Sequence, residues 1–234
     1  MNPDPVRTAL PDPMGWLTSL PAELRNEVLR RCSEITKQQG QIVYRADDLA
    51  GGIFTLVSGR LDYHWTHLLG GETLFYAVGP GWWVGDLAAI SGQPRRLDLV
   101  AGRDSKVLHL SRASIRELSA TRPDFMPALF NMISETLRAA VSVLEFMSID
   151  DPTIRTAACL RLLNRTGGGW NGSLLLSQNE LAIICKISRR QMNMALNEFS
   201  HDSIVELGYG KLSVPDPVKI DEFLMNKRIK LYKH

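Results

Sequence analysis

The sequence predicts an α+β protein in three parts: an N-terminal antiparallel β-roll, a long central helix, and a C-terminal domain of short helices with a hairpin. Apolar residues alternate with a period of two in short runs between residues 42 and 101. From residue 126 to 147 they recur instead at spacings of four and three, and helix-start signals follow one another after residue 150. These patterns predict three segments, at residues 1–122, 123–150 and 151–234.

Composition limits the number of domains and argues against a membrane protein. The chain has 234 residues, of which 44% are hydrophobic, and this suits one large or two small domains. From Asp151 onward twelve basic and eight acidic residues give a net charge of +4, against −2 before it. No apolar run reaches membrane-spanning length and the N-terminus lacks the pattern of a signal peptide, so we expect a cytoplasmic protein with no membrane partner.

Cysteine usage argues against a metal centre. Cys32, Cys159 and Cys185 are odd in number and far apart in sequence, with no Cys-x-x-Cys pair. Neither a disulfide framework nor a zinc or iron–sulfur ligand set follows from them, so we predict no metal site and no iron–sulfur cluster.

The first segment has the pattern of a small antiparallel sandwich or roll. A tail with four prolines at residues 1–13 precedes a helix from Pro21. Glycine-rich turns then separate short alternating runs at steps of roughly ten residues. Ser111 is placed to cap a short helix that extends to Leu118. The strands expected from these runs are 42–44, 54–56, 61–65, 74–78 and 97–101.

The central segment predicts one long helix, from Pro123 to Asp150. At ~1.5 Å per residue it would be about 42 Å long. Its apolar residues hold a heptad pattern for about three heptads, which is typical of one helix that pairs with another. The alternative is a helix buried within one domain. The dimerisation residues predicted by the pattern, which begins at Met126, are Phe130, Ile133, Leu137, Ala140, Leu144 and Met147.

The last segment predicts a helix-turn-helix followed by a wing. Asp151 and Pro152 start a helix that ends near Asn164, and two capping boxes then begin two helices separated by two residues. The second helix carries a polar face of Arg, Gln and Asn, and residues 204–214 form a hairpin. The alternative is a small helical domain with a solvated polar face. The predicted DNA-contacting residues are Ser177, Gln178, Ser188, Arg189, Arg190, Gln191, Asn193 and Lys211.

In this order the three parts resemble the CRP/FNR superfamily of bacterial transcription regulators. Residues 53–61 resemble the family's early strand-turn-strand, residues 85–95 its phosphate-binding cassette, and residues 176–189 its helix-turn-helix. The resemblance implies that the roll is a double-stranded β-helix related to cyclic nucleotide-binding domains. It also implies a homodimer that binds double-stranded DNA, and it admits RNA polymerase as a further partner.

The cassette residues carry the ligand-binding prediction. Gly85 opens a short helix whose backbone N–H groups suit an anion, Arg95 would pair with a cyclic phosphate, and Asp86 would accept from a ribose hydroxyl. The alternative for Arg95 and Arg96 is a solvated strand end. The predicted ligand-binding residues are Gly85, Asp86, Leu87, Arg95 and Arg96.

Three departures from the family pattern argue against a standard cAMP pocket. Asp86 is one methylene shorter than the usual Glu, and Arg96 stands where cyclic-nucleotide binders carry a small residue. Ala140 and Val141 fall where the family places purine-contacting polar residues, and neither side chain forms hydrogen bonds. A cyclic nucleotide is therefore disfavoured as the cofactor, and the effector is left unassigned.

Two departures concern the DNA-binding end. Arg190 stands where the family often has Glu, and it suits guanine or phosphate. Lys186 replaces the usual turn glycine, so it must adopt a left-handed backbone at some cost.

The function that these patterns predict is a homodimeric, sequence-specific DNA-binding transcription regulator with an effector-sensing N-terminal domain. Two alternatives remain. One is a cAMP-responsive regulator of the same family, and the other is a ligand-binding or protein-interaction module with a vestigial helix-turn-helix. No nucleophile–base pair or carboxylate dyad stands out, so we predict that the protein is not an enzyme.

Overall fold

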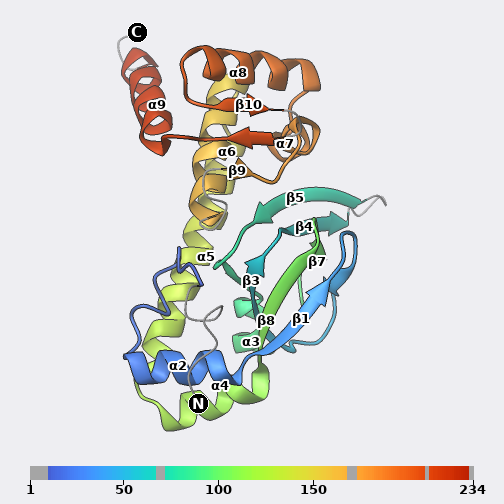
Figure 1. Ribbon diagram of the computed structural model, residues 1–234, viewed down its shortest axis with the longest axis vertical. Coiled ribbons are helices and arrows are strands. Elements are labelled where there is room, and N and C mark those ends of the chain that lie inside the picture. The colour runs from blue at the N-terminus through green and yellow to red at the C-terminus, as the bar shows by residue number, and fades with distance from the viewer. Residues whose placement is uncertain (1–9, 67–71, 168–172, 209–210, 232–234) are drawn as a thin grey trace. The chain divides into compact units, whose positions relative to one another are not determined.

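The computed structural model describes residues 10–66, 72–167, 173–208 and 211–231, and it divides into two compact units, Met1–Arg138 and Ala139–His234 (Figure 1). The division falls inside the long helix α5 (Phe125–Met147), whereas the sequence predicted boundaries at 122/123 and 150/151. The reason is that α5 contributes to both units. Phe125 packs against Trp16 in the first unit, with ring centroids 6.4 Å apart, and Ser142 lines a pocket of the second.

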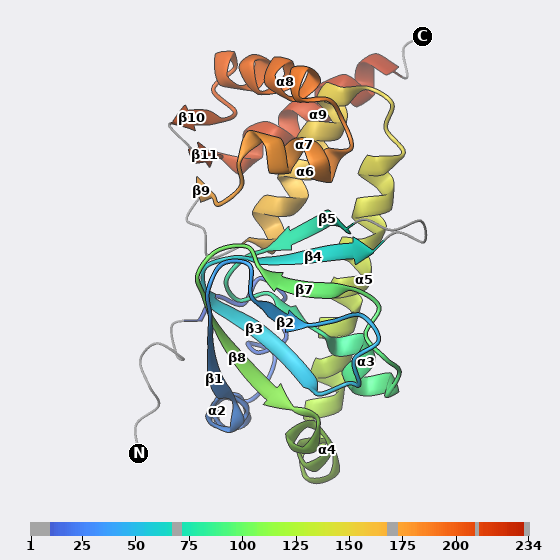
Figure 2. The same ribbon diagram turned by 90° about the vertical axis from the view of Figure 1, so that its right-hand side faces the viewer.

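Two four-stranded antiparallel sheets form the roll of the first unit (Figure 2). The five predicted strands are confirmed as β2, β3, β4, β5 and β7, and the described residues form three further strands in this unit that were not predicted. One sheet has the order β1-β8-β3-β6, and its strands are Ser33–Lys37, Ser105–Ser111, Gly52–Ser58 and Trp83–Val84. The other has the order β2-β7-β4-β5, and its strands are Ile42–Tyr44, Asp98–Ala101, Leu61–Thr66 and Glu72–Val78.

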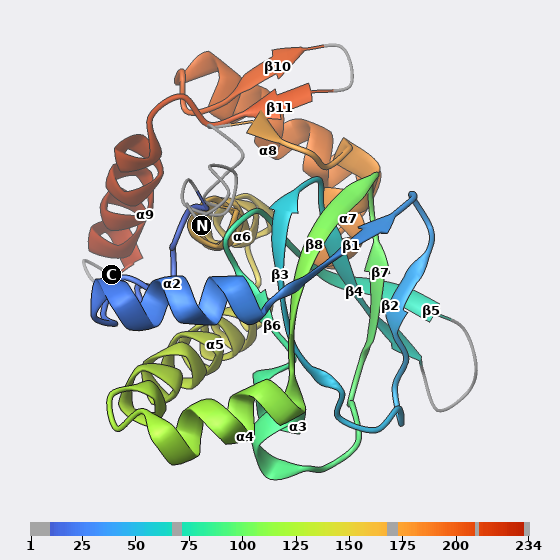
Figure 3. The ribbon, with the colours of Figure 1, turned by 60° about the horizontal axis from the view of Figure 1, so that its bottom comes forward.

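Among its described residues the first unit also has three shorter helices: α2 (Ala22–Arg31), α3 (Asp86–Ser91) and α4 (Arg112–Thr121) (Figure 3). Ser111 caps α4 as predicted, because its side chain accepts a hydrogen bond from the Ser114 N–H. An ion pair joins α2 to α4, with Arg31 Nη1 2.8 Å from Glu117 Oε2.

The core of the first unit includes part of the chain before α2. Trp16 and Trp83 are fully buried and meet edge to face, with ring centroids 5.0 Å apart. The Asp12 carboxylate accepts a hydrogen bond from the Thr18 N–H at 2.7 Å, so the end of the predicted proline-rich tail is already tied to this core segment. Residues 1–9 of that tail lie outside the described residues.

After the end of α5, the second unit continues with α6 (Pro152–Thr166), which Asp151 caps as predicted with Pro152 in its first turn. Both predicted capping boxes are confirmed, at Ser177 and at Ser188. They start α7 (Gln178–Cys185) and α8 (Arg189–His201), and a three-stranded sheet of order β10-β11-β9 supplies the predicted hairpin. Its strands are Glu206–Gly208, Lys211–Ser213 and Ser173–Leu174.

A last helix, α9 (Pro217–Leu231), was not predicted. It packs on the inner face of α8, where Phe223 meets Phe199 edge to face with ring centroids 5.2 Å apart. The predicted α+β class is therefore confirmed, with antiparallel sheets in the first unit and a helical domain with a small sheet in the second. No helix among the described residues is long and apolar enough to cross a membrane.

Candidate functional site

The cassette is organised around the Arg95 side chain. Arg95 is 3% exposed, and its guanidinium donates to the carbonyl oxygens of Gly85 at 2.7 Å and Gly52 at 2.6 Å. It also lies over the Tyr44 ring, 4.3 Å from the centroid. Gly85 has a left-handed φ of 87°, a backbone conformation that favours glycine, and an added Cβ there would meet the guanidinium of Arg95.

Two buried polar atoms of the cassette have no hydrogen-bond partner among the described residues, Arg95 Nε and Asp86 Oδ2. Asp86 is 4% exposed, and burial raises the pKa of its carboxyl group, against the opposing effects of the Thr136 hydroxyl and the Leu87 N–H. Unpartnered groups of this kind suit a polar ligand, because each lacks the compensation that buried polar atoms normally have. Arg95 therefore fits an anionic group of a ligand, and Asp86 fits a hydroxyl group of the same ligand.

Other predicted ligand contacts do not join this cluster. Leu87 is 64% exposed, and Arg96 is also exposed. Ala140 and Val141, for which the sequence predicted no hydrogen bond to a purine, are both exposed and apolar. The structure thus brings together Gly85, Asp86 and Arg95, and the roles of the predicted residues in ligand binding stay predictions.

Sequence reasoning missed the aromatic residues around Arg95. Burial raises the pKa of Tyr44 to about 12, so this phenol is neutral at physiological pH. Phe54 lies 5.7 Å from the guanidinium carbon and stacks on His109, with ring centroids 4.4 Å apart. Tyr44 and Phe54 appeared in predicted strands, but the alternation that predicts a strand does not say which distant residue its side chain contacts.

The turn between α7 and α8 is a second candidate site. Lys186 has φ 49° and ψ 48°, which confirms the left-handed conformation predicted for it. Its carbonyl and that of Cys185 accept hydrogen bonds from Arg155 of α6, at 3.4 and 3.3 Å. Arg155 also donates to the Ile149 carbonyl at 2.7 Å. One side chain therefore ties the turn to the segment that precedes α6.

Helix α8 separates an apolar face from a polar one. Met192, Ala195, Leu196 and Phe199 are fully buried. The predicted DNA-contacting residues on the other face are exposed: Arg189, Arg190, Gln191 and Asn193. This exposed polar face of α8 can therefore contact another molecule.

Three of the predicted DNA-contacting residues have a local structural role. The side chains of Ser177 and Ser188 cap α7 and α8, and the Gln191 amide oxygen accepts from the Ser188 N–H at 2.9 Å. Gln178 is exposed in the first turn of α7. The hairpin pairs Gly208 with Lys211, but the Lys211 side chain and the predicted turn residues Tyr209 and Gly210 lie outside the described part of the structure.

An exposed apolar stripe runs along α5. Phe130, Leu137 and Leu144 of the predicted heptad are 57%, 63% and 71% exposed, and Val141 lies beside them. The opposite face of α5 is buried, with Leu129, Met132, Val143 and Phe146 at 5% exposure or less. The helix is therefore not buried within its own chain, as the alternative interpretation required. Its predicted role in dimerisation stays a prediction.

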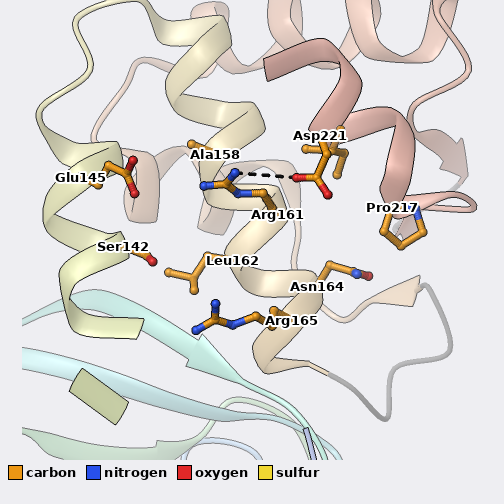
Figure 4. A pocket seen from close by; sticks show the side chains of 10 residues that line it. Ser142, Glu145, Ala158, Arg161, Leu162, Asn164, Arg165, Pro217 and Asp221 are labelled. Carbon is orange, nitrogen blue, oxygen red and sulfur yellow. Dashed lines mark ion pairs between the residues drawn. The ribbon is translucent and has the colours of Figure 1, made fainter. Parts of the chain in front are cut away.

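A pocket of about 490 Å³ lies in the second unit, between the end of α5, α6 and α9 (Figure 4). Figure 4 shows Arg161 directed toward Asp221, and their nearest atoms are 3.7 Å apart. Arg165 and Glu145 also line the pocket. Two basic and two acidic side chains leave no net charge that would select an anion.

The fold brings two cysteines together that are separated in sequence. Cys159 of α6 contacts Cys185 of α7, and burial raises the pKa of the Cys159 thiol well above its usual value. Both thiols are free and buried. Among the described residues no group of three or more His, Cys, Asp or Glu side chains is arranged to hold a metal ion.

Comparison with known proteins agrees with this geometry. A family model described as cyclic nucleotide-binding domain matches residues 34–122. The cyclic AMP receptor protein of Thermus thermophilus is 27% identical over 184 residues, which cover 79% of this chain and 84% of that protein. A CRP-like cAMP-activated global transcriptional regulator of Mycobacterium tuberculosis is 24% identical over 187 residues, which cover 78% of this chain and 84% of that protein.

A solved structure shows the same fold. FixK2 from Bradyrhizobium japonicum superposes with a TM-score of 0.69 at 18% identity, over 82% of this chain and 96% of that one. The roll, the cassette, the long helix and the winged helix-turn-helix follow in the order that the sequence predicted. Residues 34–122 therefore match the cyclic nucleotide-binding domain, and the chain is similar in sequence and in fold to transcription regulators of the CRP type.

Proposed function

We propose that the protein is a homodimeric regulator that binds DNA sequence-specifically through α7, α8 and the β10–β11 hairpin. The observation that carries this proposal is the polar face of α8. It presents Arg189, Arg190 and Asn193 near the N-terminus of a helix whose opposite face is fully buried. Arg suits bidentate contacts with guanine and Asn with adenine, and both side chains also reach phosphates. The exposed stripe on α5 supports dimerisation by the same helix in a second copy.

We further propose that the effector pocket of the first unit is not a standard cAMP site. Two guanidinium N–H groups of Arg95 already donate to backbone carbonyls, and the side chain is almost fully buried. A phosphate would have to replace bonds that the protein itself satisfies, which lowers the net gain from binding. Ala140 and Val141 supply none of the polar contacts expected near a purine, and Arg96 stands where cyclic-nucleotide binders carry a small residue.

A second candidate, a cAMP-responsive regulator, is favoured by the unpartnered Asp86 Oδ2 and Arg95 Nε. The names of the Thermus and Mycobacterium relatives point the same way. Titration of operator DNA with and without cAMP separates the two candidates. We expect the same affinity in both titrations, whereas binding that requires cAMP would establish the second candidate. Neither candidate function includes catalysis. Both place the protein in the cytoplasm, because a bacterial transcription regulator binds chromosomal DNA there.

Replacing Arg190 or Arg189 by alanine tests the DNA-binding surface. If each arginine contacts a base edge or a phosphate, each variant should lose about 1–3 kcal/mol of binding free energy. The measurement is a fluorescence anisotropy titration at one fixed salt concentration, on operators selected from a random duplex pool. Both side chains are exposed, so the fold should be unaffected.

Arg116→Ala is the matched control for these variants. Arg116 is an exposed arginine on α4 of the first unit, so the substitution removes the same charge away from α8. Its affinity should equal that of the wild type. Wild-type affinity in both Arg189→Ala and Arg190→Ala would refute the assignment of α8 and favour an interaction module with a vestigial helix-turn-helix.

A further inference from the structure

One apolar side chain on the polar face of α8 does not pack into the core. Met194 is 63% exposed, although Met192, Ala195, Leu196 and Phe199 of the same helix are fully buried. A single exposed apolar residue is common on protein surfaces and is not informative by itself. Its position, however, places Met194 within the surface that we assign to DNA.

Met194 shares a face with the basic residue that we expect to contact a base. It follows Arg190 by four residues, and side chains at this spacing lie on one face of a helix. Asn193 and Asn197, both exposed, flank it. At ~1.5 Å per residue, Arg190 and Met194 are about 6 Å apart along the helix axis. At ~3.4 Å per base pair, this corresponds to about two base-pair steps.

The chemistry of methionine restricts what it can recognise in the major groove. Its thioether donates no hydrogen bond and accepts only weakly, so it cannot match the polar edges of guanine, cytosine or adenine. Among the four bases thymine alone presents an apolar group there, the C5-methyl. An unbranched, polarizable side chain adapts its shape to such a contact.

We propose that Met194 determines specificity for thymine by packing against the C5-methyl group of one thymine in each half-site. That thymine lies within about two base pairs of the base contacted by Arg190. This inference rests on the proposed function, because it concerns the DNA-binding surface of α8.

Deoxyuridine provides a direct test, because it differs from thymidine only by this methyl group. Operators are selected from a random duplex pool with the wild-type protein, and each thymine is then replaced by deoxyuridine in both half-sites. At one thymine position per half-site, loss of the buried methyl should weaken wild-type binding roughly fourfold per half-site, or more than tenfold overall. Met194→Ala should bind the thymidine and deoxyuridine operators with equal affinity.

Met225→Ala is the matched control, since Met225 is an exposed methionine, 69% exposed, on α9. It should keep the wild-type preference for thymidine. If no thymine position responds in the wild type, or if Met194→Ala still discriminates, the inference is wrong while sequence-specific binding stands. If no sequence is enriched from the pool, the proposed function itself fails and the inference fails with it.

Discussion

Replacing Leu137 and Leu144 together by glutamate is expected to make the protein monomeric and to reduce operator affinity by at least about 100-fold. These two leucines lie seven residues apart on α5 and are 63% and 71% exposed in one chain. In a paired helix they would face the partner, and each glutamate would bury an unpaired charge in the interface. Coupled binding of two half-sites contributes an affinity gain of about 10²–10⁴, which a monomer loses.

Sedimentation velocity and the operator titration measure the two expected losses. Because both leucines are exposed, the variant chain should keep its fold, which circular dichroism checks. Leu49→Glu is the control, since Leu49 is 83% exposed in the loop between β2 and β3. A double variant that remains dimeric would show that α5 is not the dimerisation helix.

Replacing Asp62 by asparagine is expected to lower the free energy of unfolding of the first unit by about 3–5 kcal/mol. Asp62 and Arg60 are 4% and 1% exposed, and they form two parallel hydrogen bonds. Arg60 Nε lies 2.7 Å from Asp62 Oδ1 and Arg60 Nη2 lies 2.6 Å from Asp62 Oδ2. Asparagine removes the carboxylate charge from this buried ion pair and one of the two oxygens that accept from Arg60.

Denaturant unfolding followed by tryptophan fluorescence measures this effect, because Trp16 and Trp83 are buried in the same unit. Glu34→Gln is the matched control. The substitution breaks the ion pair between Glu34 and Lys106, whose side chains are 37% and 42% exposed respectively. It should lower the free energy of unfolding by less than about 1 kcal/mol. Equal losses in the two variants would contradict the account of the buried pair.

The sequence predicted β7 because alternation of residue type and of burial coincide there. Leu99 and Ala101 are fully buried, and Asp98 and Val100 between them are half-buried. β8 was missed because Val107 and Leu108 are adjacent and both buried, so its pattern is not strictly alternating. β1 was missed because four of its five residues are polar. α9 was missed because its apolar residues, such as Val218 and Met225, are not confined to one buried face.

The candidate sites could be predicted where a local motif determines the geometry. Capping boxes at Ser177 and Ser188 depend on residues three positions apart, so they are visible in the sequence. The carbonyl of Gly52, which accepts from Arg95, lies 43 residues away in sequence, and the contact depends on the packing of the whole roll. The contact between Cys159 and Cys185 is of the same kind, since it requires α6 and α7 to pack together.

The spacing between half-sites tests the central claim, a homodimer that binds DNA through two copies of α8, most directly. Two recognition helices of a symmetric dimer contact major grooves one helical turn apart, about 34 Å or 10 base pairs. Insertion of about five base pairs between the selected half-sites turns one of them to the opposite side of the duplex. We predict that affinity for this operator falls to that of a single half-site. Unchanged affinity, or selected sequences without a repeated half-site, would contradict the account.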